Sequence, residues 1–134
     1  MAYTVAAFVS ALSGLSITGV TRTYGYPPES VNNADLPIAY VRLPESSNEA
    51  ISLTSATGTD AVMGELVVLV RADNLSMNTT NFAAMVSLID NINAALKTAA
   101  EASNRFDRWT IRQESALVGD AGYWAIVASV EASG

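Results

Sequence analysis

The side chains that most enzymes use for acid–base or nucleophilic chemistry are scarce in this sequence. Its 134 residues include no histidine and no cysteine. Without histidine, a Ser-His-Asp hydrolase, a histidine general base and the commonest metal ligand are excluded. Without cysteine, a thiolate metal site and a disulfide framework are excluded as well. We therefore expect no catalytic residue, no metal, no cofactor and no enzymatic activity in this chain.

Paired carboxylates are the acid–base chemistry that remains. Glu45 and Glu49 lie close together in a stretch rich in serine, and two carboxylates can serve glycoside hydrolysis. Acidic pairs in such polar loops are mostly solvated surface, so we assign this pair no catalytic role. The glycines form neither a Gly-x-Gly-x-x-Gly nor a Gly-x-x-x-x-Gly-Lys-Ser/Thr phosphate loop, so nucleotide binding is not expected either.

One local cluster of basic and aromatic side chains is present, formed by Arg105, Phe106, Arg108, Trp109 and Arg112. Such a cluster can stack on nucleic acid. Asp107 and Glu114 lie in the same stretch and can pair with the arginines, and the 13 acidic against 7 basic residues give the chain a net charge of -6. That charge disfavours phosphate binding. An ion pair between subunits is the better interpretation of Arg108 and Arg112.

Two further groups are candidates for protein contacts. Tyr24 and Tyr26 belong to a stiff Tyr-Gly-Tyr-Pro-Pro segment. Either a partner protein buries this segment, or the segment folds back over the sheet as a lid on the core. Arg42 and Arg71 are expected at the ends of strands, beside acidic residues, where they orient a contact or decorate a sheet edge. The complete set of candidate interface residues is Tyr24, Tyr26, Arg42, Glu45, Glu49, Arg71, Arg108 and Arg112.

Two helices are predicted from apolar spacing. The first is capped by Thr4 and has apolar residues at three- and four-residue intervals as far as Leu15. The second begins near Thr80, with Asn78, Thr79 and Thr80 as capping candidates, and ends at about Ala102. Its expected buried stripe is Phe82, Met85, Ile89, Ile92, Leu96 and Ala99, widened by Val86 and Leu88.

Four strands are predicted, over Leu36–Leu43, Ala61–Ala72, Trp109–Leu117 and Tyr123–Glu131. Ser16–Asn33 is read as a loop or arm, and the polar stretch Pro44–Asp60 as a long hairpin excursion. We expect one α+β domain over residues 1–134, with a mainly antiparallel sheet of about four strands in the order α-β-β-α-β-β and helices packed on it. The second strand is apolar on both faces, so loops, the first helix or a neighbouring copy must cover the face that the long helix leaves open.

The start of the chain is apolar but lacks the basic segment of a secretory signal, so no export signal is expected. No uncharged apolar run reaches the roughly 18 residues that a bilayer-spanning helix needs. A soluble protein is therefore expected.

Four features together resemble the tail terminator, or tail completion, proteins of lambda-like long-tailed bacteriophages. They are the N-terminal helix, the Ala34–Val41 start of the first strand, the Gly64–Val70 strand after a polar hairpin, and the Asp120–Trp124 turn into the last strand. The resemblance spans roughly Val5 to Glu131. The Tyr-Gly-Tyr-Pro-Pro segment and the Ser/Thr-rich hairpin match no fixed motif of that family.

This resemblance implies a virion structural protein located at the head–tail junction and assembled in the host cytoplasm. Its copies would form a ring, usually of six, that caps the tail tube, stops its polymerisation and offers a joining surface to a head completion or neck protein. DNA would pass through the lumen without specific binding, which the acidic balance of the chain would favour. Two alternatives stay open: another neck protein, such as a head completion adaptor or stopper, or a monomeric α+β module that binds a small ligand.

Overall fold

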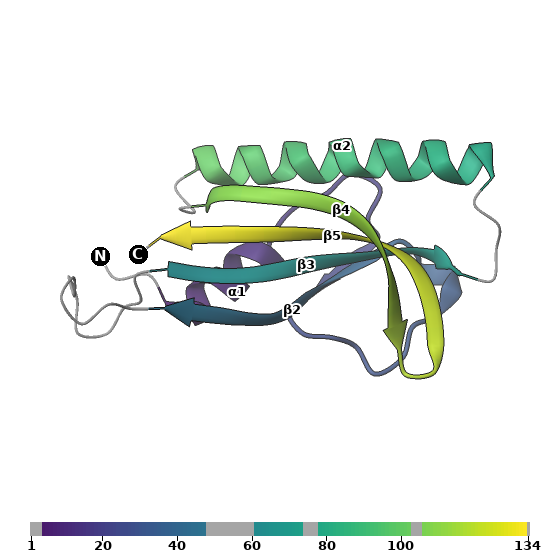
Figure 1. Cartoon of the computed structure of the whole chain (residues 1–134), viewed down its shortest axis with the longest axis horizontal. Helices are drawn as coiled ribbons and strands as arrows, with labels where there is room; N and C mark the ends of the chain where they lie inside the picture. The colour runs from purple at the N-terminus through teal and green to yellow at the C-terminus, as the bar shows by residue number, and fades with distance from the viewer. Residues whose placement is uncertain (1–3, 48–60, 74–77, 103–105, 134) are drawn as a thin grey trace.

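A single five-stranded sheet with both helices on one face organises the computed structural model, which describes residues 4–47, 61–73, 78–102 and 106–133 (Figure 1). The strands lie side by side in the order β1-β2-β3-β5-β4. Along the chain the elements are α1 (Val5–Ser13), β1 (Arg22–Tyr24), the short 3-10 helix η1 (Asn33–Asp35), β2 (Ile38–Ser47), β3 (Ala61–Ala72), α2 (Thr79–Glu101), β4 (Phe106–Val118) and β5 (Ala121–Ser133). The mixed α+β class predicted from the sequence is confirmed.

Both helices begin at the caps that the sequence indicates. The Thr4 side chain accepts a hydrogen bond from the Ala7 backbone N–H at 3.1 Å, and Asn78 accepts one from Asn81 at 2.9 Å. These bonds satisfy backbone donors that the first turn of a helix leaves without an intrahelical partner. α1 ends earlier than its apolar spacing predicts, because Gly14 takes the C-cap position.

The sheet has one strand more than predicted. β1 lies within the segment that we expected to be a loop or arm, and it pairs with β2 in parallel, with Arg22 opposite Ile38 and Tyr24 opposite Tyr40. A strand this short shows no alternation that a pattern could detect. All other neighbouring strands pair antiparallel, as expected.

β2 extends to Ser47, past the expected end at Leu43. Its pairing with β3 shifts register between Arg42 and Glu45, the interval that contains Pro44. A proline has no N–H to donate, and an irregularity on a strand that lacks a neighbour on its outer side accommodates it. Residues 48–60, most of the predicted hairpin excursion, lie outside the described residues.

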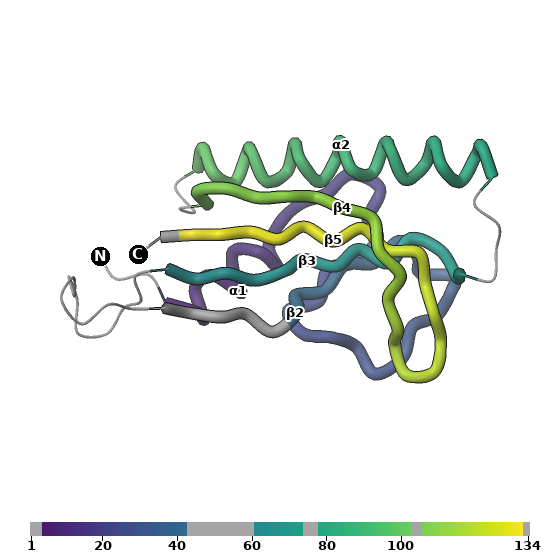
Figure 2. The backbone as a smooth tube through the Cα atoms, viewed as in Figure 1, coloured from purple at the N-terminus to yellow at the C-terminus, as the bar shows by residue number. Residues whose placement is uncertain are grey.

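β4 and β5 are both longer than predicted and form the most extensive pairing in the sheet, from Phe106 opposite Ala132 to Val118 opposite Ala121. Gly119 lies at the turn between them with a φ of 61°, a conformation that favours glycine. The ends of the two strands nearest this turn curl away from α2 (Figures 1 and 2).

The main core lies between the helices and one face of the sheet. α1 contributes Phe8 and Leu12, and α2 contributes Met85, Leu88, Ile92, Leu96 and Ala99. β3 places Leu66 and Val68 against them, both with no exposed surface. The expected stripe of α2 is wrong at Phe82, which is 62% exposed. Its expected widening is confirmed at Leu88, which is buried, and wrong at Val86, which is 44% exposed.

The opposite face of the sheet is covered over only part of its area. A second core of Ile38, Tyr40, Val67, Leu69, Val118, Tyr123, Ala125 and Val127 lies there. Tyr24 at the end of β1 packs against it, and the segment between β1 and β2 covers it with Val31 and Leu36. Of the three possible covers that the sequence left open, the chain's own loop is therefore the one observed, since both helices lie on the other face.

Candidate assembly surface

The uncovered part of the second sheet face carries a network of ion pairs centred on Glu65. Arg42 Nε donates to Glu65 Oε1 at 2.7 Å, and Arg112 Nη2 donates to Oε2 at 2.6 Å. The Ser129 hydroxyl donates to the same Oε2 at 3.1 Å and accepts from Arg112 Nη1 at 2.7 Å. One carboxylate thus ties together three strands besides its own.

This geometry controls the protonation of Glu65. Its partial burial alone would raise the pKa of the carboxyl, but hydrogen bonds from Arg112, Arg42 and Ser129 outweigh burial and hold the pKa below its ordinary value of 4.5. The Glu65 side chain is 27% exposed, against about 40% for both arginines. The network is therefore charged and partly desolvated at neutral pH.

Two further ion pairs extend the network along β4 and β5. Arg112 Nε lies 2.5 Å from Glu114 Oε2, and Arg108 Nε lies 3.7 Å from Glu131 Oε2. The Arg108 side chain is 78% exposed, so its pair is open to water and weak. Arg108 is thus the cation of this surface that can most easily take another partner.

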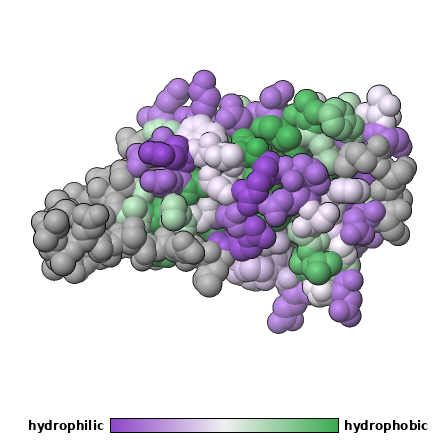
Figure 3. All heavy atoms as spheres, in the orientation of Figure 1, coloured by the Kyte–Doolittle hydropathy of each residue, from purple (hydrophilic) through white to green (hydrophobic). Residues whose placement is uncertain are grey.

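Strand register explains why these residues meet although they are distant in the sequence. Arg42 pairs with Glu65, Glu65 with Ser129, and Ser129 with Thr110, so the four positions form one row across the sheet. Side chains of paired residues share a face. Figure 3 shows this face with a hydrophilic band across its centre.

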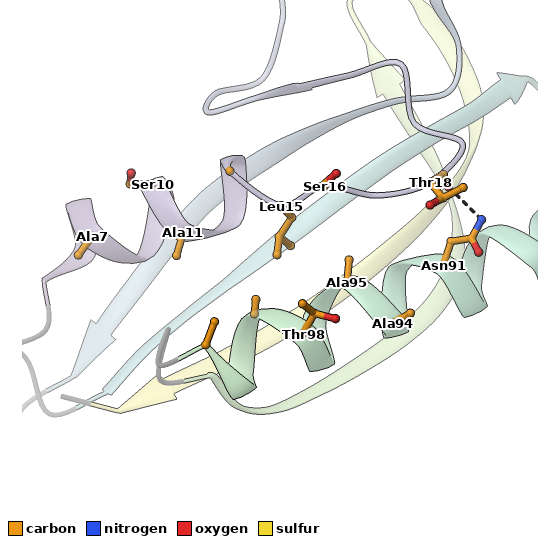
Figure 4. A pocket seen from close by; sticks show the side chains of 13 residues that line it. Ala7, Ser10, Ala11, Leu15, Ser16, Thr18, Asn91, Ala94, Ala95 and Thr98 are labelled. Carbon is orange, nitrogen blue, oxygen red and sulfur yellow. Dashed lines mark hydrogen bonds between the residues drawn. The ribbon is translucent and has the colours of Figure 1, made fainter.

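Two of the hollows on the described part of the molecule bear on the candidate surface or on the helices. One, of about 430 Å³, adjoins the network beside Met63, Arg108 and Glu131. The other, of about 770 Å³, is an open groove between α1 and α2 whose lining consists mainly of alanine, serine and threonine (Figure 4). Asn91 closes one end of this groove by donating from Nδ2 to the Thr18 carbonyl oxygen at 2.9 Å. Among the described residues that line the groove, none is charged.

Some of the predicted site residues come together at the Glu65 network, and the others lie elsewhere in the molecule. Arg42 and Arg112 come together on Glu65, and Arg108 lies beside them. Arg42 was expected at the end of its strand. It lies within β2 instead, and its side chain contacts Glu65 on the neighbouring strand β3. The expected pairing of Glu114 with the arginine cluster is present.

The other predicted residues lie elsewhere. Arg71 is near the end of β3, opposite Trp124, away from the network. Glu45 is opposite Met63 in the β2–β3 register, and Glu49 lies outside the described residues. Tyr24 packs against the second core, whereas Tyr26 is 64% exposed, so the lid interpretation holds for one tyrosine only. Their rings are 6.0 Å apart, edge to face.

Glu65 and Ser129 are the network residues that sequence reasoning missed. A signal was present: Glu65 is the only charged residue in an otherwise apolar strand interior, from Ala61 to Val70. A carboxylate in such a position needs partners on neighbouring strands. Which arginines supply them depends on strand order, which the sequence pattern does not give.

Neither a metal centre nor a transmembrane helix is found in the described part of the chain. No group of three or more acidic residues there could hold a metal ion, and no helix there is long and apolar enough to cross a membrane. No family model matches the sequence, and a search of curated proteins finds no match. The geometry of the surface therefore carries the functional argument.

Proposed function

We propose that this chain is a virion structural protein of the tail-terminator kind. Its copies form a ring that caps a phage tail tube, ends polymerisation of the tube and presents a surface for head joining. The observation that carries the proposal is the open sheet face, on which Glu65 fixes Arg42 and Arg112 into a pre-organised polar surface. The sequence resemblance supplies the context in which such a surface would serve assembly.

The construction of this face suits a protein contact better than a small-molecule site. Its charges are held by bonds between strands, so little side-chain entropy remains to be lost on association. The charges on it are mixed, with Arg42, Arg108 and Arg112 against Glu65, Glu114 and Glu131. Mixed charges set the register and orientation of a partner, which a stacked ring on a tube requires.

The net charge of -6 fits a ring through which DNA passes. A nucleic-acid-binding protein neutralises phosphates with lysine and arginine. Here Arg42 and Arg112 are already closely paired with glutamates, so these two arginines are poorly available to phosphates. DNA would meet a wall that does not retain it.

The two alternatives differ in what the chain should bind. An adaptor or stopper at the same neck would form a ring but bind the head rather than the tube. A ligand-binding module would be monomeric and would use a concave apolar pocket with a few convergent polar groups. The larger hollow, between α1 and α2, is an open groove and not a pocket that would enclose most of a ligand, which does not favour that alternative.

Negative-stain imaging tests the proposal. The purified chain is imaged across a concentration series, alone and with tail tubes from the same source, and it is added to polymerising tube protein. Rings at one end of each tube, together with tubes that stop growing, are the expected result. Rings that bind heads but not tubes would transfer the assignment to another neck protein, and monomers without tube binding would overturn it.

A further inference from the structure

The sheet has two edges without a strand neighbour among the described residues. β4 is the last strand on one side, and its outer edge is unpaired from Phe106 to Val118. On the other side β1 pairs with β2 only from Ile38 to Tyr40, so the outer edge of Val41–Ser47 also has no strand partner there. Unpaired edges offer rows of backbone donors and acceptors to another strand.

The two edges match in position. Thr110 of β4 is in the same row as Arg42 of β2, through Ser129 and Glu65. The part of β4 from Phe106 to Ile111 is therefore level with the free part of β2, since Ile111 is in the row of Val41 and Phe106 is in the row of Ser46. The remaining half of β4, which would be level with β1, curls away together with β5 (Figure 1). The free part of the β2 edge is thus level with the straight part of the β4 edge.

The strand directions also agree. β2 is antiparallel to β3, β3 to β5, and β5 to β4, so β2 and β4 run in opposite directions. A second copy placed beside the first by rotation about an axis along the strands keeps these directions. β4 of one copy would then lie antiparallel to β2 of the next, as in the rest of the sheet. Because the two edges differ, the contact is heterologous and can close into a ring.

The charges at this junction are complementary. Arg108 is level with Glu131, Met63 and Glu45 in the register across the sheet. In a level junction Arg108 of one copy therefore faces position 45 of the next, which is a glutamate. Arg108 is well exposed and its own ion pair with Glu131 is long, so it can take this second partner.

We propose that the outer edge of β4 pairs with the Val41–Ser47 edge of β2 in a second copy of this chain, with position 108 of one copy level with position 45 of the next. This inference rests on the proposed ring function and names the contact that builds the ring. It predicts one sheet that continues around the ring, with the helices of all copies on the same side.

A disulfide experiment tests the junction directly, because the chain has no cysteine of its own. Arg108→Cys and Glu45→Cys are introduced into the same full-length chain, which is then mildly oxidised and analysed on a non-reducing gel. Within one copy the two positions are three strand spacings, roughly 14 Å, apart. This exceeds the roughly 7 Å between Cα atoms that a disulfide can bridge. Any bond between the two positions must therefore link two copies.

The expected result is a ladder of covalent multimers whose highest band gives the copy number of the ring. Each single cysteine variant is the matched control and should give dimers at most. As a second test, Arg108→Glu should reduce the fraction of chain in rings at least tenfold, and adding Glu45→Arg should restore it. Circular dichroism shows that each variant is folded.

The outcomes separate this junction from the proposed function. Wild-type rings on tubes, with a double cysteine variant that stops at dimers, would overturn the junction and leave the function standing. A ladder from a chain that never caps tubes would support the junction and overturn the terminator role. Absence of both rings and ladder would overturn the two proposals together.

Discussion

The two faces of the sheet are built by different means. On the helix face, Leu66, Val68 and Ile126 have no exposed surface and pack against apolar side chains of α1 and α2. On the opposite face, the same strands carry Glu65 and Ser129 in a half-exposed network. The comparison teaches that one strand can serve stability with alternate residues and offer a contact surface with the others. Substitutions on the two faces should therefore affect different properties.

The largest effect is expected on the helix face. Leu66→Ala removes a fully buried side chain from the centre of the main core and should lower the free energy of unfolding by about 4 kcal/mol. The matched variant Leu69→Ala, on the loop-covered face, should cost about 2–3 kcal/mol because a loop relaxes into a cavity more readily than packed helices do. Urea unfolding followed by circular dichroism measures both. A larger loss for Leu69→Ala would reverse the comparison.

The next effect is at the network centre. Glu65→Gln leaves Arg42 without a charged partner and leaves Arg112 with Glu114 alone. It should cost about 2 kcal/mol, since the site is only partly desolvated. Glu131→Gln, in the exposed pair with Arg108, should cost less than about 0.5 kcal/mol. Equal values in urea titrations of the two variants would show that the network contributes nothing beyond ordinary surface pairs.

The network also predicts a pH dependence. The pKa of Glu65 is lower in the folded state than its ordinary value of 4.5, so the folded state binds the proton less tightly than the unfolded state. The stabilisation is therefore fully present above 4.5 and is lost as the pH falls through the lower folded pKa. Stability measured between pH 7 and pH 3 should decline less in Glu65→Gln than in the wild type. Parallel curves for the two proteins would contradict the assignment.

A smaller effect is expected where α2 meets β4. Trp109 Nε1 donates to Asn93 Oδ1 at 2.9 Å, and Trp109→Phe removes this bond while keeping an aromatic ring. The expected loss is about 1 kcal/mol. Asn93→Ala should cost a similar amount, and the double variant little more, because both changes remove the same bond. Additive losses in thermal unfolding would indicate that the bond contributes nothing.

The smallest effect on stability should accompany a large effect on assembly. Arg108→Gln removes an exposed cation whose ion pair is weak, so the free energy of unfolding should change by less than about 0.5 kcal/mol. If Arg108 contacts a second copy, the fraction of chain in rings should nevertheless fall. Sedimentation velocity beside urea unfolding separates the two properties. A destabilised variant that still assembles fully would contradict the role given to this residue.

The helices and the central strands could be predicted because they depend on local patterns. Thr4 and Asn78 are capping residues immediately before apolar repeats, and the bounds of β3 agree with the predicted Ala61–Ala72. β1 could not be predicted, because three residues held only by pairing with β2 have no pattern of their own. The exposure of Phe82 also could not be predicted, because the spacing of apolar residues along a helix does not show how far the sheet extends beneath it.

The sequence predicted Arg42 and Arg112 as residues of the candidate surface, but it did not predict Glu65, which lies at the centre of the network. Arg42 and Arg112 lie on strands at opposite sides of the sheet, and only the order β2-β3-β5-β4 brings both to Glu65. That order is a long-range property, since β5 lies between β3 and β4 although it follows β4 in the chain. The sequence pattern indicates that a partly buried charge such as Glu65 needs an ion-pair partner, but the order of the strands determines which arginines lie close enough to provide it.

Native mass spectrometry of the purified full-length chain tests most directly the claim that this protein is built to assemble into a ring. The spectra are recorded across a concentration series. They are recorded again after the chain has been incubated with tail tubes and the tubes have been dissociated. One closed oligomer with a single copy number is expected for the wild type, and Arg108→Glu should reduce it to monomers. A chain that stays monomeric in both conditions, or that forms an open-ended series of oligomers, would contradict this claim.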